Sequence, residues 1–370
     1  MTIPVTLYRD FPEDHRTSMD VYAVSLIKAL REYFPTDVLV REFIPQLPRG
    51  LSGGAWAMRL ARYGFYPFQA WQSRGKLNHV LDHGYGHLLY SLDPDRTVVT
   101  VHDLIPLVRW HGGIDGVLPG ARPRLNQFSF KALQRAKRLI AISENTRQDL
   151  INYAGCKPEN IVVVYYGIEA MFKPYTAEHK VDARLKWNCP DDGTKRVLIS
   201  GSQFYKNLPA ILKSFARLKA LYGDYVELLK VGLPDPVWDQ DVRNLGLLDP
   251  PRTLGAVSHT EMPELLNCVE LLLFPSFYEG FGRPPLEAMA CGVPVVASNA
   301  ASLPEVIGDA GILCDPLDTE SMAQAMYLLL TDDMMREMYI QRGLTQAKRF
   351  TWQETARKTL NVYEMIARER

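Results

Sequence analysis

The stretch ELLLFPSFYEGFGRPPLEAMACGVPVVAS, residues 270–298, carries the clearest structural pattern in the chain. An apolar run at Leu271–Phe274 predicts a strand, and the glycines that follow it predict a tight turn. The two prolines at 284–285 suit the first turn of a helix, and Gly292 suits its end. Because Val293–Ala297 then has the composition of a second strand, the stretch predicts a βαβ unit with its glycine turn at the carboxyl edge of a parallel sheet.

Short apolar, β-branched runs alternate with helical patterns through the rest of the chain. This alternation is typical of parallel sheets covered by helices. In the first half we expect strands at Ile3–Tyr8, Asp37–Arg41, Thr97–Val101, Arg138–Ile142 and Ile161–Val164. In the second half we expect strands at Arg196–Ser200, Glu227–Val231, Val269–Phe274 and Val293–Ala297. The predicted fold class is therefore α/β, with one Rossmann-like sheet in each half.

The length of the chain also favours two domains. A chain of 370 residues with 47% hydrophobic and 23% charged residues is too long for one ordinary core and has the composition of a folded protein. The polar stretch between Phe172 and Lys195 has no strand character and is the expected linker. We expect domains at 1–175 and 176–351, and a final helix at 352–370 that crosses back to the first domain.

Charge and cysteine content exclude several classes of protein. Lysines plus arginines number 42 and so do the acids, so the chain has no overall field that attracts nucleic acid. The five cysteines are widely spaced, which disfavours a disulfide framework and a zinc site. The N-terminus has no signal-peptide pattern, and no stretch approaches the roughly 18 apolar residues of a membrane span. A cytoplasmic protein is therefore expected.

Two carboxylates, Glu279 and Glu287, flank the glycine turn. A carboxylate can accept two hydrogen bonds from the vicinal diol of a ribose or a pyranose. Gly280 and Gly282 let backbone amides approach a sugar phosphate closely, and the helix start can face an anion. Glutamates at this spacing also occur as solvated acids at a helix start, so the spacing alone leaves both interpretations open.

The segment EGFGRPPLEAMACGVPVV, residues 279–296, resembles the E-x7-E signature of the retaining glycosyltransferases of family 4. The resemblance implies the GT-B fold, in which two Rossmann-like domains face a central cleft. It implies that Glu279 contacts hydroxyls of the transferred sugar and that Glu287 holds the nucleotide ribose. The amides around Gly280, Phe281 and Gly282 would lie near the sugar and the diphosphate.

Two other segments are similar to the same family. VTVHDLIPL contains His102 directly after an apolar strand, where the resemblance implies a histidine beside the reacting sugar. A satisfied core histidine is the alternative. LISGSQFYKNLPAILKSFARL, residues 198–218, contains Lys206, which the resemblance places at the diphosphate. A surface lysine is the alternative there, although a cation at a helix start opposes the helix dipole unless an anion lies beside it.

The chain departs from the family pattern at several positions. Many members have arginine where this chain has Ser202 and Tyr205, which weakens the expected cationic grip on the diphosphate, although Ser202 stays a candidate donor-binding residue. Arg283, where the family usually has an aliphatic residue, is either a compensating cation or a surface residue. The glycine pair of the first N-domain loop is replaced by the residues at 16–19, so the mode of acceptor binding stays open.

The resemblance implies hexose transfer with retention, mannose being one candidate, from a nucleoside-diphosphate sugar to a glycan or lipid-linked acceptor in cell-surface polysaccharide biosynthesis. No DxD-type acid pair follows a strand, so we expect neither a metal ion nor a cofactor. Lys206, loop amides and the helix start would stabilise the leaving diphosphate. One alternative is a GT-B epimerase or phosphorylase, and another is a Rossmann ligand-binding protein. A Rossmann dinucleotide site requires G-x-G-x-x-G after the first strand, and Tyr8–Met19 does not contain it.

Residues 55–76 combine aromatic and cationic side chains. This mixture suits peripheral contact with the inner face of a membrane. The alternative is a helix and loop packed on the rim of the first domain. Pro67 is expected to break any long continuous helix in this segment.

Overall fold

The computed structural model describes residues 2–48, 54–121, 126–233, 235–246 and 250–369. The chain forms two compact units. Unit 1 contains the chain up to Gly113, Leu118–Gly167 and the chain from Phe350 onward. Unit 2 contains Ile114–Val117 and Ile168–Arg349.

Within its described residues, unit 1 contains a six-stranded parallel sheet with the order β2-β1-β3-β4-β5-β6. Its strands are β1 (Ile3–Tyr8), β2 (Val38–Phe43), β3 (Leu77–Val80), β4 (Thr97–Val101), β5 (Arg138–Ala141) and β6 (Ile161–Val163). All residues of β3 and β4 are buried, as expected for central parallel strands covered on both faces. The strand order reverses between β1 and β3, and ligands of such sheets bind beside this point at the carboxyl edge.

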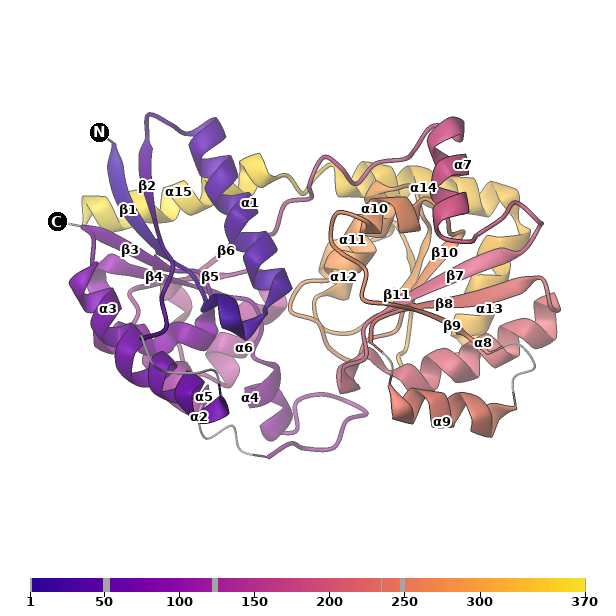
Figure 1. Cartoon of the computed structure of the whole chain (residues 1–370), viewed down its shortest axis with the longest axis horizontal. Helices are drawn as coiled ribbons and strands as arrows, with labels where there is room; N and C mark the ends of the chain where they lie inside the picture. The colour runs from indigo at the N-terminus through magenta and orange to yellow at the C-terminus, as the bar shows by residue number, and fades with distance from the viewer. Residues whose placement is uncertain (1, 49–53, 122–125, 234, 247–249, 370) are drawn as a thin grey trace. The chain divides into compact units, whose positions relative to one another are not determined.

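Helices from both ends of the chain pack against this sheet. Figure 1 shows α15 (Trp352–Arg368, yellow) beside α1 (Thr17–Tyr33, indigo), and α15 also contacts β1, β3 and β5. At the start of α15 the backbone approaches Gly167 so closely that a Cβ there would lie 2.2 Å from the Trp352 nitrogen. The other helical segments include α2 (Ala55–Leu60), the π-turn (Ala61–Phe65), α3 (Tyr66–Gln72), a 3-10 segment (His83–Tyr90), α4 (Ile105–Trp110), α5 (Asn126–Leu133) and α6 (Glu144–Asn152).

Unit 2 contains a second six-stranded parallel sheet in its described part, with the order β12-β11-β10-β7-β8-β9. Its strands are β7 (Lys195–Ser200), β8 (Val226–Val231), β9 (Arg252–Gly255), β10 (Leu271–Phe274), β11 (Val295–Ser298) and β12 (Ile312–Cys314). The order corresponds to 6-5-4-1-2-3 within the unit, the arrangement of dinucleotide-binding sheets, and it reverses between β7 and β10.

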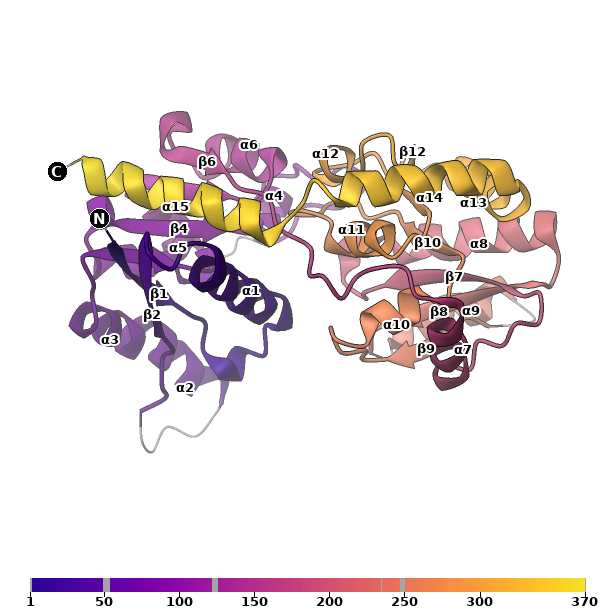
Figure 2. The ribbon, with the colours of Figure 1, turned by 90° about the horizontal axis from the view of Figure 1, so that it is seen from above.

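The helices of unit 2 surround this sheet. Figure 2 shows α13 (Thr319–Thr331) next to α14 (Asp333–Ala347), and the core joins Phe215 of α8 (Leu208–Tyr222) to Met322 and Met326 of α13. The remaining helices are α7 (Ala177–Lys186), α9 (Pro236–Leu245), α10 (Met262–Leu266), α11 (Arg283–Ala290) and α12 (Leu303–Ile307). The α/β class with one parallel sheet in each half is confirmed.

The sequence analysis missed three strands, β3, β9 and β12, and it missed α7 inside the expected linker. β3 has the sequence LNHV, whose polar residues do not look like a buried central strand. Its Asn78 Oδ1 accepts from the Tyr8 hydroxyl at 3.2 Å, and the ring nitrogens of His79 lie 2.7 Å from the Tyr363 hydroxyl and from Thr100 Oγ1. Tertiary hydrogen bonds therefore permit polar residues in this strand.

The expected break at Pro67 is wrong. Residues 55–72 form a continuous helical run in which a π-turn, Ala61–Phe65, joins α2 to α3. The Tyr66 N–H donates to the Ala61 carbonyl, five residues back. The wider turn places Pro67 in the first turn of α3, where the missing N–H of proline is tolerated.

Candidate active site

The predicted donor residues of unit 2 gather where its strand order reverses. β7 leads into the loop at 201–207, and β10 leads into the loop at 275–282. Lys206 in the first loop and Glu279 in the second form an ion pair, with 2.8 Å between Nζ and Oε1. Two residues that are 73 positions apart are thus brought together at the carboxyl edge of the sheet.

Several contacts hold Lys206 in place. Lys206 is only 9% exposed, and its Nζ lies 4.3 Å from the centroid of the Phe274 ring. The next residue, Asn207, has a positive φ of 58° and precedes α8. Its side-chain amide donates to the carbonyls of Pro275 and Pro316, at 3.1 and 2.6 Å. The surface-lysine interpretation is therefore wrong, because Lys206 is a buried cation on a fixed turn.

The Ser302 side chain contacts the backbone of the glycine turn. Its hydroxyl lies 2.9 Å from the Glu279 carbonyl oxygen and 2.6 Å from that of Phe281. Gly282 has a φ of 114°, and a Cβ there would lie 2.8 Å from the Leu303 side chain, so this position requires glycine. Helix α11 begins directly after it, with Pro284 and Pro285 in its first turn. The βαβ unit predicted from the sequence is confirmed in order and composition.

Glu287 lies inside α11 and is only 6% exposed, so it is not a solvated helix acid. Burial raises the pKa of its carboxyl group, against the attraction of Arg283 and His259. Arg283 Nη2 lies 3.2 Å from Glu287 Oε1 and 3.3 Å from Glu169 Oε2. The alternative that Arg283 is a surface residue is wrong as well, because its guanidinium contacts two carboxylates.

His102 follows β4 in unit 1 and is buried. Its Nε2 lies 2.7 Å from the Leu81 carbonyl oxygen, which can only accept, so Nε2 carries the ring proton. Nδ1 is in close contact with the Tyr166 hydroxyl and accepts from it. Burial lowers the pKa of His102 to about 4. At neutral pH the ring is an uncharged imidazole with both nitrogens engaged.

The sequence analysis missed a polar cluster at the strand reversal of unit 1. Asp10 follows β1, and Asp82 and His83 follow β3. The Arg16 guanidinium is in close contact with Asp82, and His83 Nδ1 lies 3.2 Å from Asp82 Oδ1. Burial and the neighbouring Asp82 raise the pKa of Asp10. Although burial alone would raise the pKa of Asp82, His83 and Arg16 hold it well below its usual range. Acids directly after strands were the available signal, but β3 had not been recognised.

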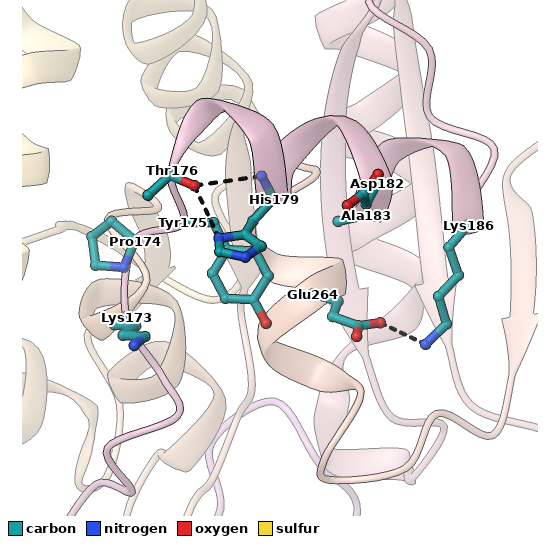
Figure 3. Close-up of a pocket in the computed structure, with 9 residues that line it drawn as sticks. All are labelled: Lys173, Pro174, Tyr175, Thr176, His179, Asp182, Ala183, Lys186 and Glu264. Carbon is teal, nitrogen blue, oxygen red and sulfur yellow. Dashed lines mark hydrogen bonds and ion pairs between the residues drawn. The ribbon is translucent and has the colours of Figure 1, made fainter.

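A groove of about 560 Å³ lies elsewhere in unit 2, between α7 and α10 (Figure 3). None of the predicted donor residues lines it. The Lys186 ammonium is paired with Glu264 at 2.5 Å and with Glu261 at 3.2 Å, and Thr176 caps α7. Because none of the predicted donor residues lines the groove and the Lys186 ammonium is already paired, we assign no function to it.

Comparisons with known proteins agree with this geometry. Residues 19–171 match the family model described as Glycosyltransferase Family 4, and residues 184–346 match that of Glycosyl transferases group 1. The chain is 30% identical over 307 residues to the O-antigen chain mannosyltransferase B of Escherichia coli, which covers 80% of this chain and 77% of the relative.

Solved structures show the same fold. Sucrose-phosphate synthase of Thermosynechococcus elongatus superposes with a TM-score of 0.80 at 19% identity, over the full length of both chains. HepE of Anabaena, solved with UDP and glucose, superposes with a TM-score of 0.75 at 17% identity, over 98% of this chain and 100% of the other. The chain is thus a GT-B protein.

The chain belongs to the family 4 (group 1) glycosyltransferases, which are of the retaining type. It is a glycosyltransferase of the hexosyltransferase family, which confirms the resemblance drawn from residues 279–296. The rival Rossmann ligand-binding protein is thereby excluded.

Proposed function

We propose that the chain transfers a hexose, with mannose as the first candidate, from a nucleoside-diphosphate sugar to a glycan or lipid-linked acceptor of a cell-surface polysaccharide. The observation that carries this proposal is the Lys206–Glu279 pair at the strand reversal of unit 2. It places a cation suited to phosphate beside a carboxylate suited to sugar hydroxyls. Similarity to the O-antigen chain mannosyltransferase B supports the sugar and the class of acceptor.

In the proposed reaction the bond between the anomeric carbon and the diphosphate breaks while the acceptor oxygen bonds to the same face of that carbon. The acceptor proton passes to the departing phosphate oxygen, so no protein base is required. Lys206 stabilises the negative charge that develops on the diphosphate. Glu279, released from Lys206 by the arriving phosphates, accepts hydrogen bonds from the sugar hydroxyls.

The other predicted donor residues are proposed to contact the ribose, the sugar and the phosphates. Glu287 holds the ribose, and the direct contact with Arg283 favours the ionised form of its carboxyl group against the effect of burial. The backbone at Gly280, Phe281 and Gly282 lies beside the sugar and the diphosphate. Ser202, which is half-buried after β7, contacts the phosphates.

His102 is proposed to act beside the reacting sugar as a neutral hydrogen-bonding group. To reach a sugar hydroxyl its ring would exchange the contact with Tyr166 or with the Leu81 carbonyl. The competing interpretation is that His102 is a core histidine. The burial of His102 and the engagement of both ring nitrogens are as consistent with a core histidine as with a catalytic one. The two interpretations differ in whether substitution changes turnover or only stability.

We also propose peripheral contact with an anionic membrane surface through residues 55–76, at the cytoplasmic face. Trp56, Phe68 and Trp71 are 73%, 55% and 48% exposed, and the Arg74 guanidinium lies 4.8 Å from the Trp71 ring centroid. Exposed aromatic rings beside cations suit the headgroup region of a bilayer. Of the helices in the described residues, none has both the length and the apolar character that crossing a bilayer demands.

A thermal-stability screen tests the proposed donor. The protein is heated with UDP, GDP and their glucose, galactose and mannose derivatives, and with matching nucleosides as controls. A ligand at 100 times its Kd adds about 2.7 kcal/mol to the free energy of unfolding. We expect a nucleoside-diphosphate sugar to stabilise the protein more than its nucleoside does. Equal melting with every nucleotide sugar and with the matching nucleosides would overturn the proposal.

A further inference from the structure

A second buried cation lies beside the proposed donor loop. Lys230, near the end of β8, is 0% exposed. Its Nζ donates to Ser202 Oγ at 3.0 Å and to the Leu233 carbonyl oxygen at 3.1 Å. Both partners are neutral, and within the described ranges no carboxylate forms an ion pair with it. An ammonium has three hydrogens, so one of them has no oxygen acceptor among the residues that the structure describes, and Nζ lies 5.7 Å from the centroid of the Trp238 ring.

The sheet brings Lys230 to the loop that also carries Lys206. β8 pairs with β7 in register, with Lys230 opposite Ile199 and Val231 opposite Ser200. A Cβ added to Gly201 would lie 2.9 Å from Lys206 Cε, and one added to Gly232 would lie 3.0 Å from Ser202 Oγ. The two lysines therefore approach the backbone at 201–202 from different elements, Lys206 from the loop after β7 and Lys230 from β8, and glycines leave room around it.

The two lysines differ in charge balance. Lys206 is paired directly with Glu279 at 2.8 Å, whereas the two hydrogen-bond partners of Lys230 are neutral and the carboxylates of Asp235 and Asp239 attract it only at longer range. A buried cation without a paired anion is unfavourable, and the cost falls when an anion binds close to it. Lys230 therefore brings to this loop a positive charge that no directly paired carboxylate among the described residues neutralises.

The contact also directs the Ser202 hydroxyl. Because its oxygen accepts from the ammonium, its own hydrogen is available to donate to another acceptor. A hydroxyl polarised by a neighbouring cation is a stronger donor than an isolated one. Ser202 is half-buried, so it offers a donor at the surface of the loop while the charge behind it stays covered.

We propose that Lys230 and Ser202 form a relay that binds the diphosphate of the donor, with Ser202 donating to a phosphate oxygen and Lys230 supplying positive charge from behind. This inference rests on the proposed function. Lys230 is a positioning residue, because it acts on the ligand through the serine.

Binding measurements on substituted proteins test the relay. The Kd values of UDP, GDP, uridine and guanosine are measured by calorimetry for the wild type, Lys230→Met and Ser202→Ala. We expect each substitution to weaken binding of the preferred nucleoside diphosphate about ten- to hundredfold. The affinity for the corresponding nucleoside should not change. The double variant should lose little more than either single variant, because both residues act through one contact.

Two further variants separate charge from folding. Lys213→Met removes an exposed lysine from α8 and should leave diphosphate binding unchanged. In the Lys230→Met background, Ser202→Arg should restore much of the lost affinity, because it places a cation directly at the loop. If Lys230→Met is unstable, Ser202→Ala keeps the test intact because it retains the lysine.

The outcomes distinguish the relay from the proposed function. A wild type that binds a nucleoside diphosphate, with Lys230→Met or Ser202→Ala binding it equally well, would overturn the relay and leave the proposed function standing. Equal losses for nucleoside and diphosphate would show that Lys230 only supports the loop, and would also overturn the relay. A wild type that binds neither UDP nor GDP would overturn both.

Discussion

The two sheets have related architectures, but the charged groups at their strand reversals differ: two carboxyl groups beside Arg16 in unit 1, and a lysine paired with Glu279 in unit 2. In unit 1 the reversal between β1 and β3 carries the buried acids Asp10 and Asp82. In unit 2 the reversal between β7 and β10 carries Lys206, with Lys230 on the adjacent strand. Cations suit a diphosphate, whereas carboxyl groups suit the hydroxyls of a neutral sugar. The difference indicates that the fold supplies a place for a ligand, and the residues after the strands select its chemistry.

The largest effects are expected on turnover, for substitutions of the proposed catalytic residues in the two units. Glu279→Ala in unit 2 and His102→Ala in unit 1 should each lower kcat about 10²–10³-fold, as for the loss of one group that stabilises a transition state. Nucleotide affinity should change far less. If both groups act on the same transition state, the double variant should lose less than the sum of the two single losses.

Steady-state kinetics with nucleotide Kd values and melting temperatures provide the measurement. Normal turnover of His102→Ala, or a lower melting temperature with unchanged kcat, would identify His102 as a core residue. Unit 1 would then contribute no group at this position to the chemistry.

A smaller effect is expected on ground-state binding in unit 2. Glu287→Ala removes the proposed ribose contact and should weaken nucleotide binding by about 1–3 kcal/mol. Calorimetry with the preferred nucleoside diphosphate provides the measurement. Glu337→Ala, which removes an exposed acid from α14, is the matched control. Unchanged affinity of a folded Glu287→Ala protein would remove this residue from the donor site.

The stability of unit 1 should fall as the pH is lowered, because this unit contains buried neutral histidines. Burial lowers the pKa of His79 to about 3 and that of His102 to about 4. Because these folded-state values lie below the unfolded value of 6.5, the unfolded state binds more protons as pH falls below 6.5. Their contribution to stability is therefore present at neutral pH and is lost between about pH 6.5 and 4, at up to about 1.4 kcal/mol per pH unit for each histidine.

Hydrogen exchange at pH 7 and pH 5 locates this effect. Amides of β3 and β4 should lose protection as pH falls, and His79→Gln should reduce that loss. Protection in these strands that does not change with pH would contradict the assignment of neutral buried histidines.

A weaker effect is expected for the exposed segment of unit 1. The protein should co-sediment with anionic vesicles at low salt and dissociate as salt rises, since each lysine or arginine near the surface contributes about 1 kcal/mol. Trp56→Ser combined with Trp71→Ser should reduce binding to vesicles without lowering the melting temperature. Equal recovery with neutral vesicles, or no binding, would favour simple packing of 55–76 on unit 1.

The smallest effect is expected on removal of metal ions. In the proposal, lysines rather than a divalent cation face the phosphates at the edge of unit 2. Transfer should therefore proceed at an unchanged rate in EDTA. Complete loss of activity that Mg²⁺ or Mn²⁺ restores would require a different means of stabilising the diphosphate.

The sequence was most informative where the signals are local. The strand, glycine turn, prolines and helix of residues 270–298 follow one another, so the βαβ unit could be predicted from spacing. β3 could not, because its Asn78 and His79 are satisfied by distant residues, among them Tyr363, 284 positions away from His79. Lys230 was hidden for the same reason, since only the sheet brings it to Ser202.

The contact between His79 and Tyr363 has a consequence for synthesis on the ribosome. Unit 1 begins first but receives α15 only after all of unit 2 has been translated. Until then the face of its sheet that α15 covers, including the ring of His79, has no partner from that helix. Unit 2 is continuous apart from the short piece at 114–117, so it can fold while unit 1 is still incomplete. The face of the sheet that α15 covers can therefore be completed only after the whole of unit 2 has been translated.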